Sequence, residues 1–282
     1  MIAGYNTNGF AHHRMEDTFA ILNELGYKSV AVTIDYPLLT SPDRKGIADA
    51  ARMLSRLTGR YDMRLTIETG ARFVLDPRRK HYPNLVSAEA SDRQRRIEFL
   101  TGAVDLAAET NADSVSFWSG ANIDDLPTPD AWSHLVNGVA AVLDHASTRS
   151  VNLAFEPEPG MVVERMAQFH RLHGELSEQT DITPLGLTLD VGHIHCLSDG
   201  TVGEHVRANR DRLFNIHLED MLVGTHEHLM FGEGTMDFDA VFSSLGEIEY
   251  AGPVHVELSR HSHNAVQTAR SARAFLARWF DS

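Results

Sequence analysis

The chain has 282 residues, of which 43% are apolar and 23% are charged, as in an ordinary globular protein. This length fits two small domains or one α/β barrel, because barrels reach about 250 residues as a single unit. The net charge of -14 repels phosphate backbones and argues against nucleic acid as a partner.

The cellular compartment is predicted from three features of the sequence. Cys196 is the single cysteine, so an intrachain disulfide is excluded and a reducing compartment is favoured. The first residues lack the basic segment and apolar core of a signal peptide. No run of about 18 apolar residues could cross a membrane. We therefore expect a cytoplasmic protein without membrane contact.

Short runs rich in apolar and β-branched residues recur along the chain. Most are continuous rather than alternating, which is typical of strands buried on both faces of a parallel sheet. The eight predicted strands are residues 2–5, 29–34, 65–68, 114–118, 152–156, 185–190, 213–218 and 253–258.

Segments with the apolar spacing of helices separate these runs. The first is predicted to end at Gly26, a typical C-cap residue. Five of the helical segments are residues 15–25, 47–57, 95–108, 131–146 (after Thr128-Pro129-Asp130) and 264–280. The long insertion 71–91 either covers the mouth of a site or forms a solvated surface loop.

Eight strands alternating with eight helices predict an α/β fold, a single (β/α)8 TIM barrel over residues 1–282. The alternative is an open doubly wound sheet, which would carry a Gly-rich phosphate-binding turn after its first strand. The segment Tyr5-Asn6-Thr7-Asn8-Gly9-Phe10 is not such a turn, so the barrel is favoured.

Polar residues stand where the predicted strands end. In a parallel barrel all these ends open on one face, where catalytic groups gather. Carboxylates that follow apolar stretches lie at the boundary of the core and need a cation or several hydrogen-bond donors. Two Glu, one Asp and one His from four strands suit manganese, magnesium or cobalt, with zinc possible; a salt-bridged polar plug is the alternative. The residues at this face are Glu68, Trp118, Glu156, Asp190, His193, His217 and Glu257.

In their order and spacing, these motifs resemble the xylose isomerase-like TIM barrels. That superfamily includes ketose 3-epimerases, hydroxypyruvate isomerase-like and inosose dehydratase-like enzymes, and family 2 AP endonucleases. The resemblance covers essentially the whole chain and is specific for the superfamily, not for one reaction. It is carried by Phe155-Glu156-Pro157, Leu189-Asp190-Val191-Gly192-His193, Asn215-Ile216-His217-Leu218-Glu219-Asp220, Gly232-Glu233-Gly234-Thr235-Met236-Asp237-Phe238 and Val256-Glu257.

The resemblance implies one divalent metal ion, preferably manganese, bound by Glu156, Asp190, His217 and Glu257. It further implies that the two glutamates are catalytic and exchange a proton with the carbon next to a carbonyl, through a metal-stabilised enediolate. His193 would hydrogen-bond the substrate. The expected activity is isomerisation or epimerisation of a sugar, keto-sugar or cyclitol, in a protein that could form a homodimer.

The sequence departs from the 3-epimerases at two positions. Where those enzymes have a Glu six residues after the first ligand and an Arg six residues after the metal-binding His, this chain has Val162 and Val223. Glu158 either points into the site or caps a helix that begins near Met161. Glu158 and Glu68 are further candidates for substrate contact. A dehydratase or 3-keto-glycoside-cleaving lyase, which expels a leaving group after the same enolate step, therefore stays open.

The loops after the fourth, seventh and last strands suggest further contacts. His226 and His228 stand where AP endonucleases carry an Asp-x-His zinc pair, and could bind a second cation, contact substrate hydroxyls or face solvent. Trp118 replaces a zinc-binding histidine of those nucleases, so a phosphodiesterase is not expected. It fits a platform for a sugar ring, or a core residue. Arg260 could hold an acidic substrate group or neutralise the acidic ligands. A non-catalytic sugar-binding barrel is the remaining alternative.

Overall fold

The computed structural model describes residues 1–36, 38 and 44–280, and in it eight parallel strands close into a barrel in the order β1-β10-β7-β6-β5-β4-β3-β2. The predicted (β/α)8 barrel is confirmed, and each strand end lies within two residues of its predicted position. The barrel strands are β1 Ile2–Asn6, β2 Ser29–Thr33, β3 Arg64–Glu68, β4 Val115–Phe117, β5 Leu153–Phe155, β6 Leu185–Asp190, β7 Leu213–Leu218 and β10 Pro253–Val256.

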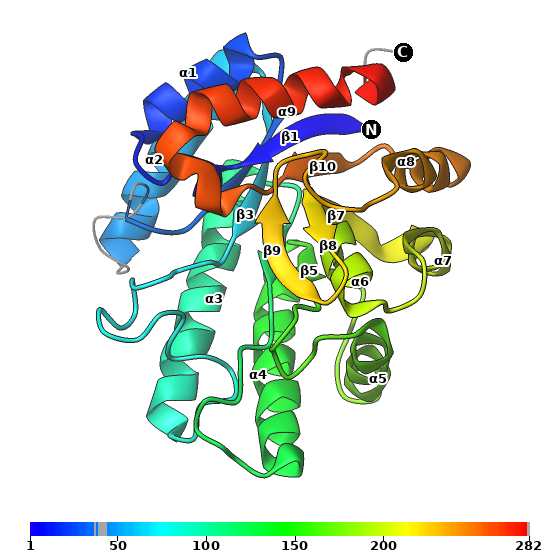
Figure 1. Ribbon diagram of the computed structural model, residues 1–282. Helices are drawn as coiled ribbons and strands as arrows, with labels where there is room; N and C mark the ends of the chain where they lie inside the picture. Colours follow the sequence, from blue (N-terminus) through cyan, green and yellow to red (C-terminus); the bar gives the residue numbers. More distant parts are fainter. Residues whose placement is uncertain (37, 39–43, 281–282) are drawn as a thin grey trace.

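Helices surround the barrel (Figure 1). None of the helices in the described part of the chain is long and apolar enough to cross a membrane. The α-helices are α1 Met15–Glu24, α2 Arg44–Tyr61, α3 Ala90–Thr110, α4 Thr128–Arg149, α5 Met166–Ser177, α6 Val191–Leu197, α7 Val202–Ala208, α8 Phe238–Glu247 and α9 Ala265–Phe280. The described residues also form three short 3-10 helices, η1 Thr7–Phe10, η2 Arg210–Arg212 and η3 Ser259–Asn264.

Two segments differ from the pattern predicted from the sequence: the start of helix α4 and the segment after β7. Helix α4 begins at Thr128 and not after Asp130, because Pro129 is tolerated in the first turn, where its missing N–H has no helical partner. After β7 the chain forms an antiparallel hairpin of β8 Asp220–Leu222 and β9 Thr225–Leu229 that packs against α6. The sequence did not predict this hairpin, because β9 is mostly polar and has no apolar run.

The insertion between β3 and α3 packs against the barrel. Leu85 and Val86 are buried, and Asn84 lies so close to Gly120 that a Cβ there would be 2.5 Å from the Asn84 side chain. The alternative of a solvated surface loop is therefore wrong for this part. Further towards its start, Lys80 and His81 line the cavity at the mouth of the barrel.

The barrel interior contains hydrogen-bonded polar side chains among its apolar residues. His255 Nδ1 lies 2.7 Å from Asn215 Oδ1, and its Nε2 lies 2.8 Å from Ser29 Oγ. Because the amide oxygen accepts from Nδ1–H, Nε2 carries the lone pair and accepts from the hydroxyl. Burial lowers the pKa of His255 well below its ordinary value, so the ring is neutral. This chain of hydrogen bonds leads from the bottom of the barrel towards its mouth.

Gly4 on β1 makes room for the His255 ring, since a Cβ at this position would lie 2.2 Å from His255 Cδ2. We expect Gly4→Ala to lower the free energy of unfolding by about 1–3 kcal/mol, because a well-packed interior does not accept an added methyl group. Chemical denaturation measures this. Gly174→Ala is the control: Gly174 is exposed on α5, and apart from its chain neighbours and its own helix backbone no described atom lies within 4 Å of a Cβ placed there, so stability should rise by about 0.5–1 kcal/mol. Unchanged stability of Gly4→Ala would contradict the packing described here.

Candidate metal centre

Four side chains meet at the carboxyl ends of four adjacent strands. Glu156 follows β5, Asp190 ends β6, His217 belongs to β7 and Glu257 follows β10, and these strands are consecutive neighbours in the barrel. One ligand atom from each residue lies within 4.8 Å of the others. The structure thus brings together the four residues that the sequence suggested as metal ligands.

His217 is the centre of this group. Its Nδ1 lies 3.1 Å from Glu156 Oε1 and 3.0 Å from Glu257 Oε2. Burial alone would lower the pKa of His217, but the surrounding carboxylates outweigh it and raise this pKa well above its ordinary value. Burial raises the pKa of Glu156 well above its usual range. For Glu257 burial acts in the same direction, but His217 outweighs it and holds the pKa below its usual range.

Glu68 orients the His217 ring. Its Oε1 lies 2.9 Å from His217 Nε2 and accepts a hydrogen bond from Asn215 Nδ2 at 3.2 Å. When Nε2–H donates to Glu68, Nδ1 is left to face the other two glutamates. The sequence suggested Glu68 as a substrate contact. The carboxylate does line the cavity, and its hydrogen bond supports a positioning role as well.

The donor set fits a divalent cation. Asp190 Oδ1 caps helix α6 by accepting the His193 backbone N–H at 2.9 Å. The other oxygen, Oδ2, is buried and accepts no hydrogen bond from any described residue. An unpartnered carboxylate oxygen beside two more carboxylates and an imidazole is costly without a positive charge, and such oxygen-rich sets suit Mn²⁺, Mg²⁺ or Co²⁺.

A cavity of about 310 Å³ opens above these residues. Apart from Asp190, which lies buried beneath it, every site residue suggested by the sequence lines this cavity. Its lining residues are Asn6, Asn8, Thr33, Glu68, Gly70, Arg72, Lys80, His81, Trp118, Glu156, Glu158, His193, His217, His226, His228, Glu257, Ser259 and Arg260. Its size is at the lower end of the range for small-molecule pockets.

Glu158 points into the cavity and does not cap a helix. The expected helix start near Met161 is wrong, because α5 begins at Met166 after a loop that turns at Gly160 with φ +82°. Burial, together with the carboxylate of Glu257, raises the pKa of Glu158 to about 7. A carboxyl group that carries a proton near neutral pH therefore lies beside the four-residue centre.

The positions of Trp118 and Arg260 bear on which of the roles suggested for each of them applies. Trp118 is half-buried, with the His81 ring edge-on at a centroid distance of 5.4 Å and the Arg96 guanidinium 5.3 Å from its ring. Trp118 therefore lines the cavity and is not a core residue. Arg260 forms an ion pair with Glu227 of strand β9, which does not support the alternative that it neutralises the acidic ligands.

Three neighbouring residues were missed by the sequence reasoning. Asn8 Nδ2 donates to Glu257 Oε1 at 2.6 Å, and the Asn215 amide donates to Glu68. Glu219 is fully buried, with neither carboxylate oxygen hydrogen-bonded to another described residue. Asn8 lies in the turn that was considered only as a phosphate loop. For Asn215 the available signal was a polar residue on the largely apolar strand β7, and for Glu219 it was a carboxylate directly after the end of that strand.

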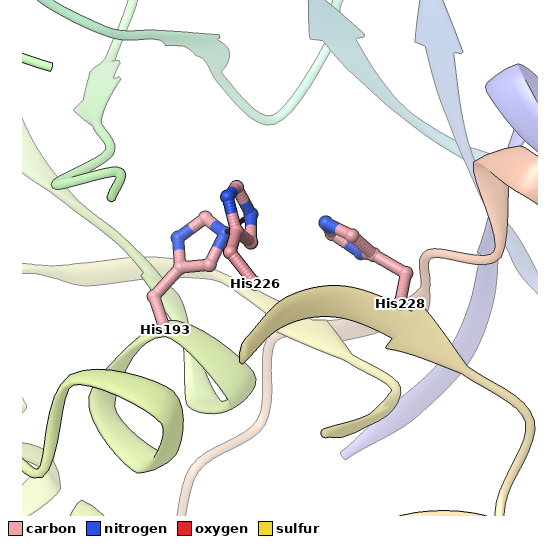
Figure 2. A group of neighbouring side chains, drawn as sticks. All are labelled: His193, His226 and His228. Carbon is pink, nitrogen blue, oxygen red and sulfur yellow. Dashed lines mark hydrogen bonds between the residues drawn. The ribbon is translucent and has the colours of Figure 1, made fainter. Parts of the chain in front are cut away.

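The remaining suggested residues, His193, His226 and His228, gather at one side of the cavity (Figure 2). Burial lowers the pKa of His193 to about 4, so its ring is neutral. Burial would also lower the pKa of His228, but Glu219 and Glu257 raise it well above its ordinary value. The structure thus joins a histidine of α6 with the two histidines of β9.

Comparison with known proteins places the chain in a family. The model for the xylose isomerase-like TIM barrel matches residues 19–279. The chain belongs to this family. The L-ribulose-5-phosphate 3-epimerase of Salmonella heidelberg is 23% identical over 266 residues, which cover 90% of this chain and 85% of that protein.

Two solved structures share the fold. An L-ribulose 3-epimerase superposes with a TM-score of 0.78 at 19% identity, covering 99% of this chain and 94% of the other. The IolI protein, solved with a zinc atom, has a TM-score of 0.73 at 17% identity and full coverage of both chains.

A cation and a proton compete for His217 Nδ1. Because the pKa of His217 is raised, the ring of the cation-free protein is protonated at neutral pH, and Mn²⁺ binding should release at least one proton. The affinity for Mn²⁺ should accordingly rise from about pH 6 to about pH 8. Calorimetry at pH 7 in buffers of different ionisation enthalpy counts the released protons. Binding without proton release would contradict this description of His217.

Proposed function

We propose that the protein is a divalent-metal-dependent isomerase or epimerase of a sugar, keto-sugar or cyclitol. The observation that carries this proposal is the pair Glu156 and Glu257, which approach the same nitrogen of His217 from the two outer strands of a four-strand group. Two carboxylates that reach one point from different sides can remove a proton on one face of a substrate and return it on the other.

Glu156, Asp190, His217 and Glu257 would hold the cation. When bound there, a divalent cation supplies Lewis acidity, which polarises a carbonyl group and lowers the pKa of the neighbouring C–H. Glu156 and Glu257 then move the proton at that carbon. Glu68 keeps the His217 ring in its orientation, and the half-buried Trp118 offers an apolar face to a sugar ring.

The relatives support a carbohydrate substrate. The relative from Salmonella heidelberg is an L-ribulose-5-phosphate 3-epimerase, and a structural neighbour is an L-ribulose 3-epimerase. The zinc atom in the IolI structure supports the binding of a metal ion by a barrel of this fold. Val223, at the position of the epimerase arginine, is 59% exposed in the hairpin turn and brings no charge to a substrate.

A lyase or dehydratase is the second candidate, and Glu158 favours it. This carboxyl group lines the cavity with a pKa raised to about 7, so it can give a proton to a departing oxygen. The two candidates share proton removal next to the carbonyl. They differ in the product: an epimer or isomer in the first case, and a dehydrated or cleaved sugar in the second.

We further propose that residues 1–282 act as one domain. The barrel closes by pairing β1 with β10, so its first and last strands depend on each other. A homodimer and a cytoplasmic location stay predictions from the sequence.

The proposed reaction is tested by incubation with Mn²⁺ in D₂O. L-Ribulose, L-ribulose 5-phosphate, D-allulose and an inosose form the panel, and NMR reports deuterium at carbon and any eliminated product. Glu257→Gln should slow the exchange by about 10²–10⁴-fold, as loss of a general base does, and Glu156→Gln should act similarly.

Glu178→Gln is the matched control, because Glu178 is exposed just after α5, and it should exchange like the wild type. Circular dichroism checks that all variants remain folded. Exchange retained in Glu257→Gln would remove this residue from the mechanism. A wild-type protein that exchanges no C–H of the whole panel would contradict both candidates.

A further inference from the structure

One wall of the cavity comes from the insertion between β3 and α3, which contributes His81 beside Trp118. In the ring of eight barrel strands β3 stands opposite β7, with β2, β1 and β10 between them on one side and β4, β5 and β6 on the other. His81 therefore reaches the cavity from the side opposite to His217. A ligand held at the four-residue centre meets His81 with a different part of its surface.

The backbone and the ring of His81 are both held in place. Its backbone N–H donates to the carbonyl oxygen of Arg72 at 2.7 Å, and its Nδ1 lies 2.7 Å from the carbonyl oxygen of Gly70. The ring stands edge-on to Trp118, with an angle of 87° between the ring planes. The φ of +60° is a left-handed conformation that persists in a residue with a Cβ only where its surroundings hold it.

The residues that hold His81 rest on a fixed base. Thr69, directly before Gly70, donates to the carbonyl oxygen of Ser116 through its backbone N–H at 3.1 Å and its hydroxyl at 2.9 Å. Its own carbonyl accepts from Arg96 Nη2 at 3.1 Å. Arg96 is buried, and its guanidinium lies 5.3 Å from the Trp118 ring. One buried cation thus supports both the chain segment and the aromatic ring that His81 contacts.

The Gly70 carbonyl determines what His81 offers to a ligand. A carbonyl only accepts, so Nδ1 carries the hydrogen and Nε2 carries a lone pair. Nε2 forms no hydrogen bond with any described residue, and it is not enclosed by the protein. Burial, with Lys80 and Arg96 acting in the same direction, lowers the pKa of His81 to about 4, so the ring is neutral at pH 7. His81 therefore presents an acceptor and no donor to the cavity.

We propose that His81 is a specificity-determining residue that accepts a hydrogen bond from one uncharged hydroxyl group of the substrate, away from the carbon that exchanges its proton. The lone pair of Nε2 attracts an O–H group and repels the oxygens of a phosphate, a carboxylate or a carbonyl. The substrate class is thereby narrowed to sugars or cyclitols with a free hydroxyl at this position. This inference rests on the proposed function, because it assigns His81 to the binding of the same substrate.

The test replaces His81 by Asn in the full chain loaded with Mn²⁺. The Asn amide can still donate to the Gly70 carbonyl and Asn tolerates a positive φ, but no acceptor remains at the place of Nε2. With the panel sugar that exchanges fastest, KM should rise about 3–10-fold while kcat stays within about 2-fold, because the lost hydrogen bond is remote from the proton transfer. His263→Asn is the matched control, since His263 is exposed in η3 and lies outside the cavity wall, and it should leave both constants unchanged.

Singly deoxygenated derivatives of the same sugar distinguish a direct contact from a change in the loop. The ratio of variant KM to wild-type KM should fall to about 1 for the derivative that lacks the hydroxyl bound by His81, and should persist for the others. His81→Phe keeps a ring against Trp118 and should single out the same derivative. A wild-type KM in His81→Asn, or one ratio for every derivative, would overturn the proposal, with circular dichroism checking the fold.

Failure of the proposed reaction gives a different result. If the wild type exchanges no C–H of the panel, the calorimetric affinity for the panel sugar that binds most tightly, and for its deoxy derivatives, takes the place of KM. The same pattern of ratios would then still support the role of His81. Equal affinities of the wild type and His81→Asn, or no binding of any panel sugar by the wild type, would overturn it.

Discussion

The crowding of two buried carboxylates and one partly buried carboxylate beside one imidazole is the constraint on which the site depends. Glu156 and Glu257 both face His217 Nδ1. Asp190 adds a third carboxylate, buried, whose Oδ2 accepts no hydrogen bond within the described chain. Removing such charges from water costs several kcal/mol for each ion unless a compensating charge is present. Without a compensating positive charge this arrangement would destabilise the barrel. The same arrangement makes the site suited to a cation.

The interior of the barrel supports that centre from below. Asn215 accepts from His255 and donates to Glu68, and Glu68 in turn accepts from His217. Each hydrogen bond sets the orientation of the next side chain, so the tautomer of His217 depends on residues deep in the barrel. Gly4 takes part only by the space it leaves for His255. Fold and site are therefore one connected network.

The parts that differ between members of such a fold lie above the strand ends. Here the hairpin β8–β9 contributes two histidines, and the loop after β3 contributes Lys80 and His81 to the cavity wall. Loops placed by a rigid barrel are where specificity usually resides. Structural neighbours at 17–19% identity keep the barrel, so what distinguishes this protein is to be sought in these segments.

The sequence by itself determined the barrel and the residues at its strand ends. Apolar runs and helical spacing are local patterns, and a parallel barrel necessarily places Glu156, Asp190, His217 and Glu257 on one face. Only the tertiary structure decided the rest. Polar β9 carries no apolar signal, so neither the hairpin nor the meeting of its histidines with His193 could be predicted. The orientation of each ring depends on carbonyls and carboxylates distant in sequence, which no local pattern encodes.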